Sequence, residues 1–131
     1  MPSRSYRGDT QPNSMEERIT YFFRMPRFPL LLDTGNELLA LRSADECEAR
    51  LPPLSLTGPP RPVIDAEAEG FAFYPELGTI TPLTLKKDWT KAEVVALYHA
   101  RKRPGARAYT RSLPNRKLSA VVSDIVALVL D

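Results

Sequence analysis

The most concentrated charge in the sequence lies between residues 101 and 117, which carry seven cationic side chains. No acidic residue occurs from Val94 through Ser123. Cations gathered on one segment can neutralise phosphates, and interleaved tyrosines can stack on unpaired bases. A helix end followed by a solvated loop explains the same cations without a ligand. The candidate nucleic-acid-binding residues are Arg101, Lys102, Arg103, Arg107, Tyr109, Arg111, Arg116 and Lys117.

A second signal is the run Leu31-Leu32-Asp33-Thr34-Gly35. Two apolar residues followed by Asp-Thr-Gly resemble the start of the active-site loop of aspartic proteases. That resemblance implies two aspartates that share one proton, and therefore a dimer of the retroviral type with Asp33 as the catalytic residue. The chain departs from the pattern at Asn36, where those proteases have a small residue, and it lacks a glycine-rich flap. A hairpin turn explains the same residues equally simply.

Three alternating acidic residues form the weakest signal. On an extended chain Asp65, Glu67 and Glu69 would face the same way and offer hard oxygen ligands to Mg²⁺ or Ca²⁺. Gly70 follows directly, so a surface turn between two strands accounts for the acids with less effort. We therefore expect no metal and no other cofactor.

Other catalytic arrangements have little support. One histidine and one cysteine cannot build a zinc site, and no phosphate-binding glycine loop or nucleophile elbow occurs. Cys47 and His99 could act as nucleophile and base, but Cys47 falls on the inner face of a predicted helix, where a thiol is normally inert packing. These observations favour a protein that is not an enzyme.

Proline positions divide the chain into short elements, because the thirteen prolines leave 30–51, 83–103 and 115–131 free. In the first half, alternation at Ile19, Tyr21 and Phe23 predicts a strand, and two apolar runs around Asp33 to Asn36 predict a hairpin. Ser43 with Glu46 predicts a capped helix that ends at Leu51.

The second half repeats strands and then adds helices. Strands are predicted over 62–66, 71–74 and 79–86, and the apolar phase of the last one slips across Pro82. Thr90 with Glu93 predicts a capped helix to about Arg103. Apolar residues at i, i+3 and i+4 spacing predict a final helix from about Asn115 to the C-terminus.

These elements predict an α+β fold with the order βββα-βββ-αα. We expect a mainly antiparallel sheet of five to six short strands, with about three helices packed mainly on one side. Residues 1–17 are polar and lack periodicity, so we expect a disordered tail there and a single domain over 18–131.

Composition narrows the function classes. A net charge of +2 requires no polyanionic partner, and the single Cys47 cannot form an internal disulfide. The longest apolar run, 125–130, is too short for a membrane span, so we expect a soluble cytoplasmic protein. In the final helix Val126 and Leu130 widen the apolar face, which is typical of association. We expect a protein-interaction module, immunity-like or regulatory, that binds a protein partner or dimerises through this helix.

Overall fold

The computed structural model describes residues 18–131, so the tail predicted over 1–17 lies outside the described residues. One six-stranded sheet has the strand order β1-β6-β5-β4-β2-β3. Its pairs are antiparallel except for β1 and β6, which run parallel. The α+β class and the order βββα-βββ-αα are confirmed. The strands are β1 (Thr20–Tyr21), β2 (Leu30–Asp33), β3 (Leu38–Leu41), β4 (Arg61–Ile64), β5 (Gly70–Tyr74) and β6 (Thr79–Thr81).

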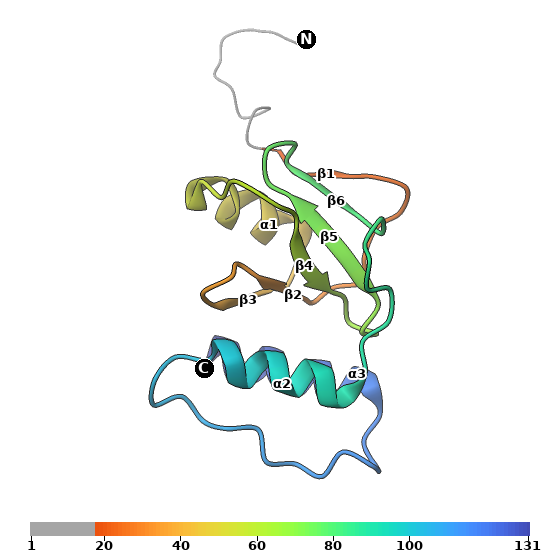
Figure 1. Cartoon of the computed structure of the whole chain (residues 1–131), viewed down its shortest axis with the longest axis vertical. Coiled ribbons are helices and arrows are strands. Elements are labelled where there is room, and N and C mark those ends of the chain that lie inside the picture. The colour runs from red at the N-terminus through yellow and green to blue at the C-terminus, as the bar shows by residue number, and fades with distance from the viewer. Residues whose placement is uncertain (1–17) are drawn as a thin grey trace, which may run out of the picture.

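Helices lie on both faces of the sheet (Figure 1). Helix α1 (Ala44–Arg50) and the short 3-10 helix η2 (Pro52–Leu54) cover one face. Helices α2 (Lys91–Arg101) and α3 (Leu118–Leu130) lie side by side on the other. Successive side chains of β2 point to opposite faces of the sheet. Leu30 and Leu32 belong to the apolar cluster beneath α1, the α1 cluster, whereas Leu31 belongs to the apolar cluster beneath α2 and α3, the α2–α3 cluster.

Local capping signals fix where the helices begin. Ser43 accepts a hydrogen bond from the Glu46 amide, as predicted, although the Glu46 carboxylate accepts from the Arg42 amide instead of closing back on Ser43. Thr90 and Glu93 form the complete predicted capping box. The last helix begins at Leu118, later than predicted, because 113–116 form a separate turn closed by the Arg116 amide and the Leu113 carbonyl.

Two predicted strands are too long. Strand β1 ends at Tyr21, and Phe23 has a φ of 72° with its side chain 70% exposed, so it does not continue the buried alternation. Strand β6 ends at Thr81 because Pro82 has no N–H to donate to a neighbouring strand. Leu83 and Leu85, which were expected to lie in this strand, are exposed.

Strand β3 is an edge strand of the sheet. All four of its residues are buried, and Arg50 of α1 donates a hydrogen bond to the Ala40 carbonyl on this strand. Helices α1 and α3 both contact β3. Among residues 18–131, no helix combines the length and apolar character that a bilayer crossing requires.

Candidate functional site

Asp33 lies at the end of β2, where its carboxylate holds a turn and binds an arginine from α2. Its Oδ1 atom accepts from the Gly35 amide and from Arg101 Nε, both at 2.8 Å, and Oδ2 accepts from Arg101 Nη2 at 3.3 Å. Gly35 has a φ of +98°, which explains the glycine at this point in the turn.

The Asp33 carboxylate accepts hydrogen bonds from Arg101 of the same chain. The same contact raises the pKa of the Arg101 guanidinium. A protease of the type suggested by the Asp-Thr-Gly run needs this carboxylate free to share a proton with a second aspartate. The observed pairing favours a structural role for Asp33.

The acidic residues 65–69 also act within the fold. Asp65 is fully buried, and its Oδ1 atom accepts from the amides of Glu67 and Glu69 at 2.9 Å. Its Oδ2 atom accepts from the amide and the Nε of Arg27 at 3.2 Å. Glu69 pairs with Arg24 and Arg27, whereas Glu67 is exposed. Residues 18–131 contain no group of three side chains placed to hold a metal ion.

The basic segment between α2 and α3 is tied to both helices. The Tyr98 hydroxyl donates to the Arg107 carbonyl at 2.5 Å, and the Tyr109 amide donates to His99 Nε2 at 3.0 Å. The Tyr109 hydroxyl donates to Asp124 at 2.8 Å, and its ring is buried in the α2–α3 cluster. Burial of the only tyrosine in this segment leaves no exposed aromatic ring there for base stacking.

Most cations of this segment also have partners. Arg101 pairs with Asp33, and both Arg116 and Arg111 pair with Asp124 at 2.8 and 3.8 Å. Arg103 donates to the main-chain oxygen of Asp131. Within residues 18–131, the remaining three have no acidic partner: Lys102, Arg107 and Lys117.

Beside α3 lies a hollow of about 610 Å³ whose charge is mixed. Arg107 and Arg111 line it together with Asp124 and Asp131. Carboxylates on the wall repel a phosphate backbone, so the hollow is poorly suited to a polyanion. The predicted basic surface is therefore partly neutralised by the fold itself.

Cys47 and His99 do not meet. Cys47 belongs to the α1 cluster on one face of the sheet, and His99 lies on α2, which covers the opposite face. Burial of Cys47 raises the pKa of its thiol to about 11. A neutral, buried thiol is a poor nucleophile, so Cys47 is a packing residue.

Sequence reasoning missed an apolar groove on the sheet face that α2 and α3 leave uncovered. The groove has a volume of about 510 Å³ and runs over β4, β5 and the chain that follows β6. Ala72 and Tyr74 of β5 form its floor. Its walls come from two segments, Pro60 to Pro62 and Pro82 to Leu85.

Two contacts hold the second wall over β5. The Gly70 amide donates to the Lys87 carbonyl at 2.6 Å, and a Cβ atom at position 70 would lie 1.8 Å from the Lys86 carbonyl oxygen. Only glycine permits this close approach. At the other end, the Tyr74 hydroxyl donates to the Leu83 carbonyl at 3.3 Å. Both ends of the segment are thus tied to β5.

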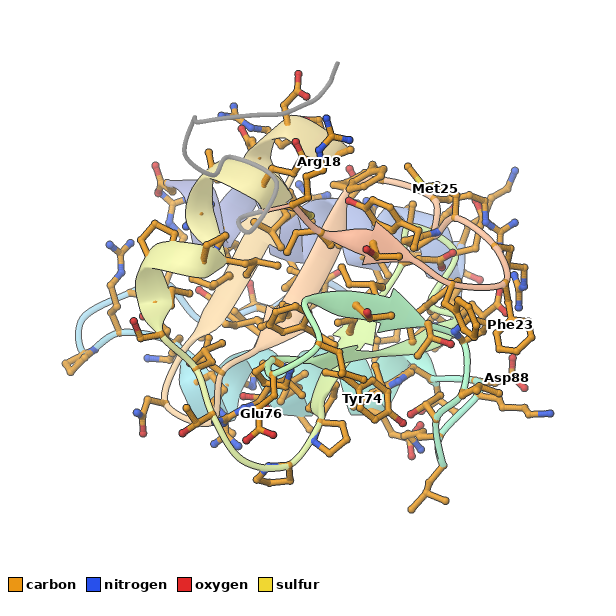
Figure 2. The ribbon with its side chains drawn as sticks, turned by 90° about the horizontal axis from the view of Figure 1, so that it is seen from above. Arg18, Phe23, Met25, Tyr74, Glu76 and Asp88 are labelled. Carbon is orange, nitrogen blue, oxygen red and sulfur yellow. The ribbon has the colours of Figure 1, made fainter. Side chains whose placement is uncertain are left out.

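The groove lies among the most exposed apolar side chains of the described residues. Leu85 is fully exposed, at 106% of its reference area, and Leu83 is 57% exposed. A second exposed set, the apolar tip, consists of Phe22, Phe23 and Met25. Figure 2 shows Phe23 and Met25 towards the periphery of the molecule. The phase slip across Pro82 was the sequence signal that marks the groove wall.

Comparisons of the chain with known protein families, with curated proteins and with solved structures found no match.

Proposed function

We propose that this chain is a non-enzymatic protein-interaction module and that the groove over β4 and β5 is its docking surface. One observation carries the proposal. The groove is formed by a segment, tied to β5 at Leu83 and Lys87, that leaves Leu83 and Leu85 in solvent, although these side chains cost free energy there. Exposed apolar patches commonly mark a binding site.

The chemistry of the groove supports binding and does not favour catalysis. Its polar side chains are Arg61, Tyr74, Thr84 and Lys87, so it contains neither a carboxylate nor a histidine to move protons. Asp33, the candidate with the strongest sequence signal, is bonded to Arg101 instead. An enzyme needs convergent acid and base groups in its pocket, and this groove pairs Tyr74 and Lys87 with no carboxylate or histidine.

The C-terminal helix is a weaker docking surface than its sequence indicates. Val126 is only 7% exposed because it packs in the α2–α3 cluster, and Leu130 is 43% exposed at the end of the chain. The apolar arc of α3 is therefore mostly used within the fold.

A photo-reactive amino acid at position 85 of the full chain tests the proposal in growing cells. We expect discrete covalent adducts from position 85 and none from position 123, a matched control on the exposed side of α3. The substitution Leu83→Ser in the same chain should remove the adducts. An adduct with the mass of two copies would indicate a homodimer. Equal labelling from both positions, or adducts that survive Leu83→Ser, would contradict the proposal.

A further inference from the structure

The groove restricts what kind of partner it can take, and this inference rests on the proposed function. Three prolines contribute to its walls, Pro60, Pro62 and Pro82, and proline has no N–H to donate. The Leu83 amide donates internally to Thr81 Oγ1 at 3.3 Å. The prolines and the bonded Leu83 amide reduce the number of main-chain donors along these walls, so side chains that fill the groove contribute much of the recognition.

The size and lining of the groove require apolar side chains from the partner. Ala72, Leu83 and Leu85 surround the space together with the Tyr74 ring. A volume of about 510 Å³ holds several aliphatic or aromatic side chains. Burying them removes apolar surface of both proteins from water, which is the main source of affinity in such contacts.

Charge at the groove has one sign. Arg61 and Lys87 are the charged residues that line it, and both are cations. The Arg61 guanidinium is already held by the carbonyls of Thr34 and Thr57, which do not line the groove, so the exposed cation available to a partner is Lys87. Lys87 has no acidic partner within residues 18–131, in contrast to its neighbour Lys86, which pairs with Glu93 at 2.7 Å.

This charge also decides between a second copy and a different partner. Two copies docked groove to groove would bring Arg61 and Lys87 of one chain towards the same cations of the other. Like charges brought together at an interface are unfavourable, whereas opposite charges favour encounter and select the partner. The cationic groove therefore favours an acidic partner over a second copy.

We infer that the groove binds a segment of another protein that carries at least two aliphatic or aromatic side chains flanked by aspartate or glutamate. The apolar side chains lie between the proline walls, and the carboxylates face Lys87. Binding of such a segment weakens as ionic strength rises, because the charge contribution is screened at this exposed site.

The test uses a random dodecapeptide display library selected against the full chain. We expect enriched peptides that combine apolar residues with aspartate or glutamate. Affinities of the selected peptides are then measured for three variants of the chain. Leu85→Ser should abolish measurable binding, and Lys87→Glu should weaken it about tenfold by replacing attraction with repulsion. Lys117→Glu, a matched charge reversal at an exposed site outside the groove, should leave it unchanged.

The other outcomes of these experiments would overturn different parts of the inference. Selected apolar peptides that lack acids, or that bind Lys87→Glu as well as the wild type, would overturn the acidic class. Failure to select any peptide that depends on Leu85 would overturn the inference as a whole. The proposed function is judged separately by the adducts from position 85. Sedimentation of the wild type and of Leu85→Ser measures the oligomeric state of each. A dimer that forms only when Leu85 is present would show that the groove binds a second copy of the chain and would overturn the acidic segment.

Discussion

Over β2 and β3 one face of the sheet is covered by α2 and α3, whereas over β5 the same face is covered only by the segment that follows β6. In the covered half Leu31 is completely buried, and the polar groups around it, such as Asp33, are bonded within the chain. In the uncovered half Leu85 is completely exposed beside a groove. The same apolar alternation thus builds a core in one half and a surface for a partner in the other.

The difference shows why residue type alone does not reveal function in this chain. The residues that could do chemistry, including Asp33 and Asp65, lie where they are needed to connect elements. Leu83 and Leu85, by contrast, extend into solvent. If this comparison is correct, changes in the covered half alter stability, and changes at the groove alter binding.

The largest effect is expected from a matched pair of leucine truncations. Leu31→Ala should lower the free energy of unfolding by about 2–5 kcal/mol, because it leaves a cavity in the α2–α3 cluster. Leu85→Ala should change it by less than about 0.5 kcal/mol, because that side chain is already in water. Urea denaturation measures both. Comparable losses in the two variants would show that the groove wall belongs to the core.

A smaller loss is expected from removing the Asp33 carboxylate. Asp33→Ala should lower the free energy of unfolding by about 1–2 kcal/mol, because the Gly35 amide and the Arg101 guanidinium lose their acceptor. Asp33→Asn should cost less, because the amide oxygen still accepts from Gly35. Glu37→Ala, at an exposed position of the same turn, is the control. If the wild type cleaves peptides at acidic pH and Asp33→Asn abolishes this cleavage, the structural role of Asp33 would be contradicted.

The buried thiol gives the stability a dependence on high pH. Burial raises the pKa of Cys47 to about 11 from the ordinary thiol value of 9.0, so the folded state keeps its proton where the unfolded state loses it. Stability from this group is complete below pH 9 and falls as pH rises from about 9 to 11, by an amount on the order of 2 kcal/mol. Urea denaturation at stepped pH should show the decline, and Cys47→Ala should flatten it. An equal slope in that variant would assign the decline to other groups.

The smallest effect is expected from the basic segment. Because four of its seven cations contact acidic residues or the chain end, we expect no salt-sensitive mobility shift with single-stranded or duplex DNA. The triple charge reversal at Arg103, Arg107 and Arg111 should therefore change nothing in that assay. A mobility shift at low salt that this variant removes would establish a nucleic-acid-binding surface in the basic segment. It would contradict the comparison between the covered and uncovered halves of the sheet.

Local signals predicted much of the fold. The Thr90–Glu93 capping box, the hairpin around Asp33 and the apolar stripe of α3 all depend on residues a few positions apart. Such short-range patterns are readable because helices and strands have fixed periods. The element order followed from these patterns together with the gaps between prolines.

The candidate site was not readable in this way, because its features join distant parts of the chain. Asp33 meets Arg101 across 68 positions, and no local pattern indicates that pairing. The groove needs Pro60 and Leu85 on opposite sides of β5, an arrangement set by the strand order. Leu83 and Leu85 looked like strand residues, and only the end of β6 at Pro82 shows that they face solvent.

Amide hydrogen exchange of the full chain, with and without a selected peptide, tests the central claim most directly. The account predicts slower exchange on binding at the groove, at the amides of Leu83, Leu85 and Lys87, with no change over residues 102–117 or in α3. Slower exchange confined to residues 102–117 or to α3, with the groove amides unchanged, would contradict it.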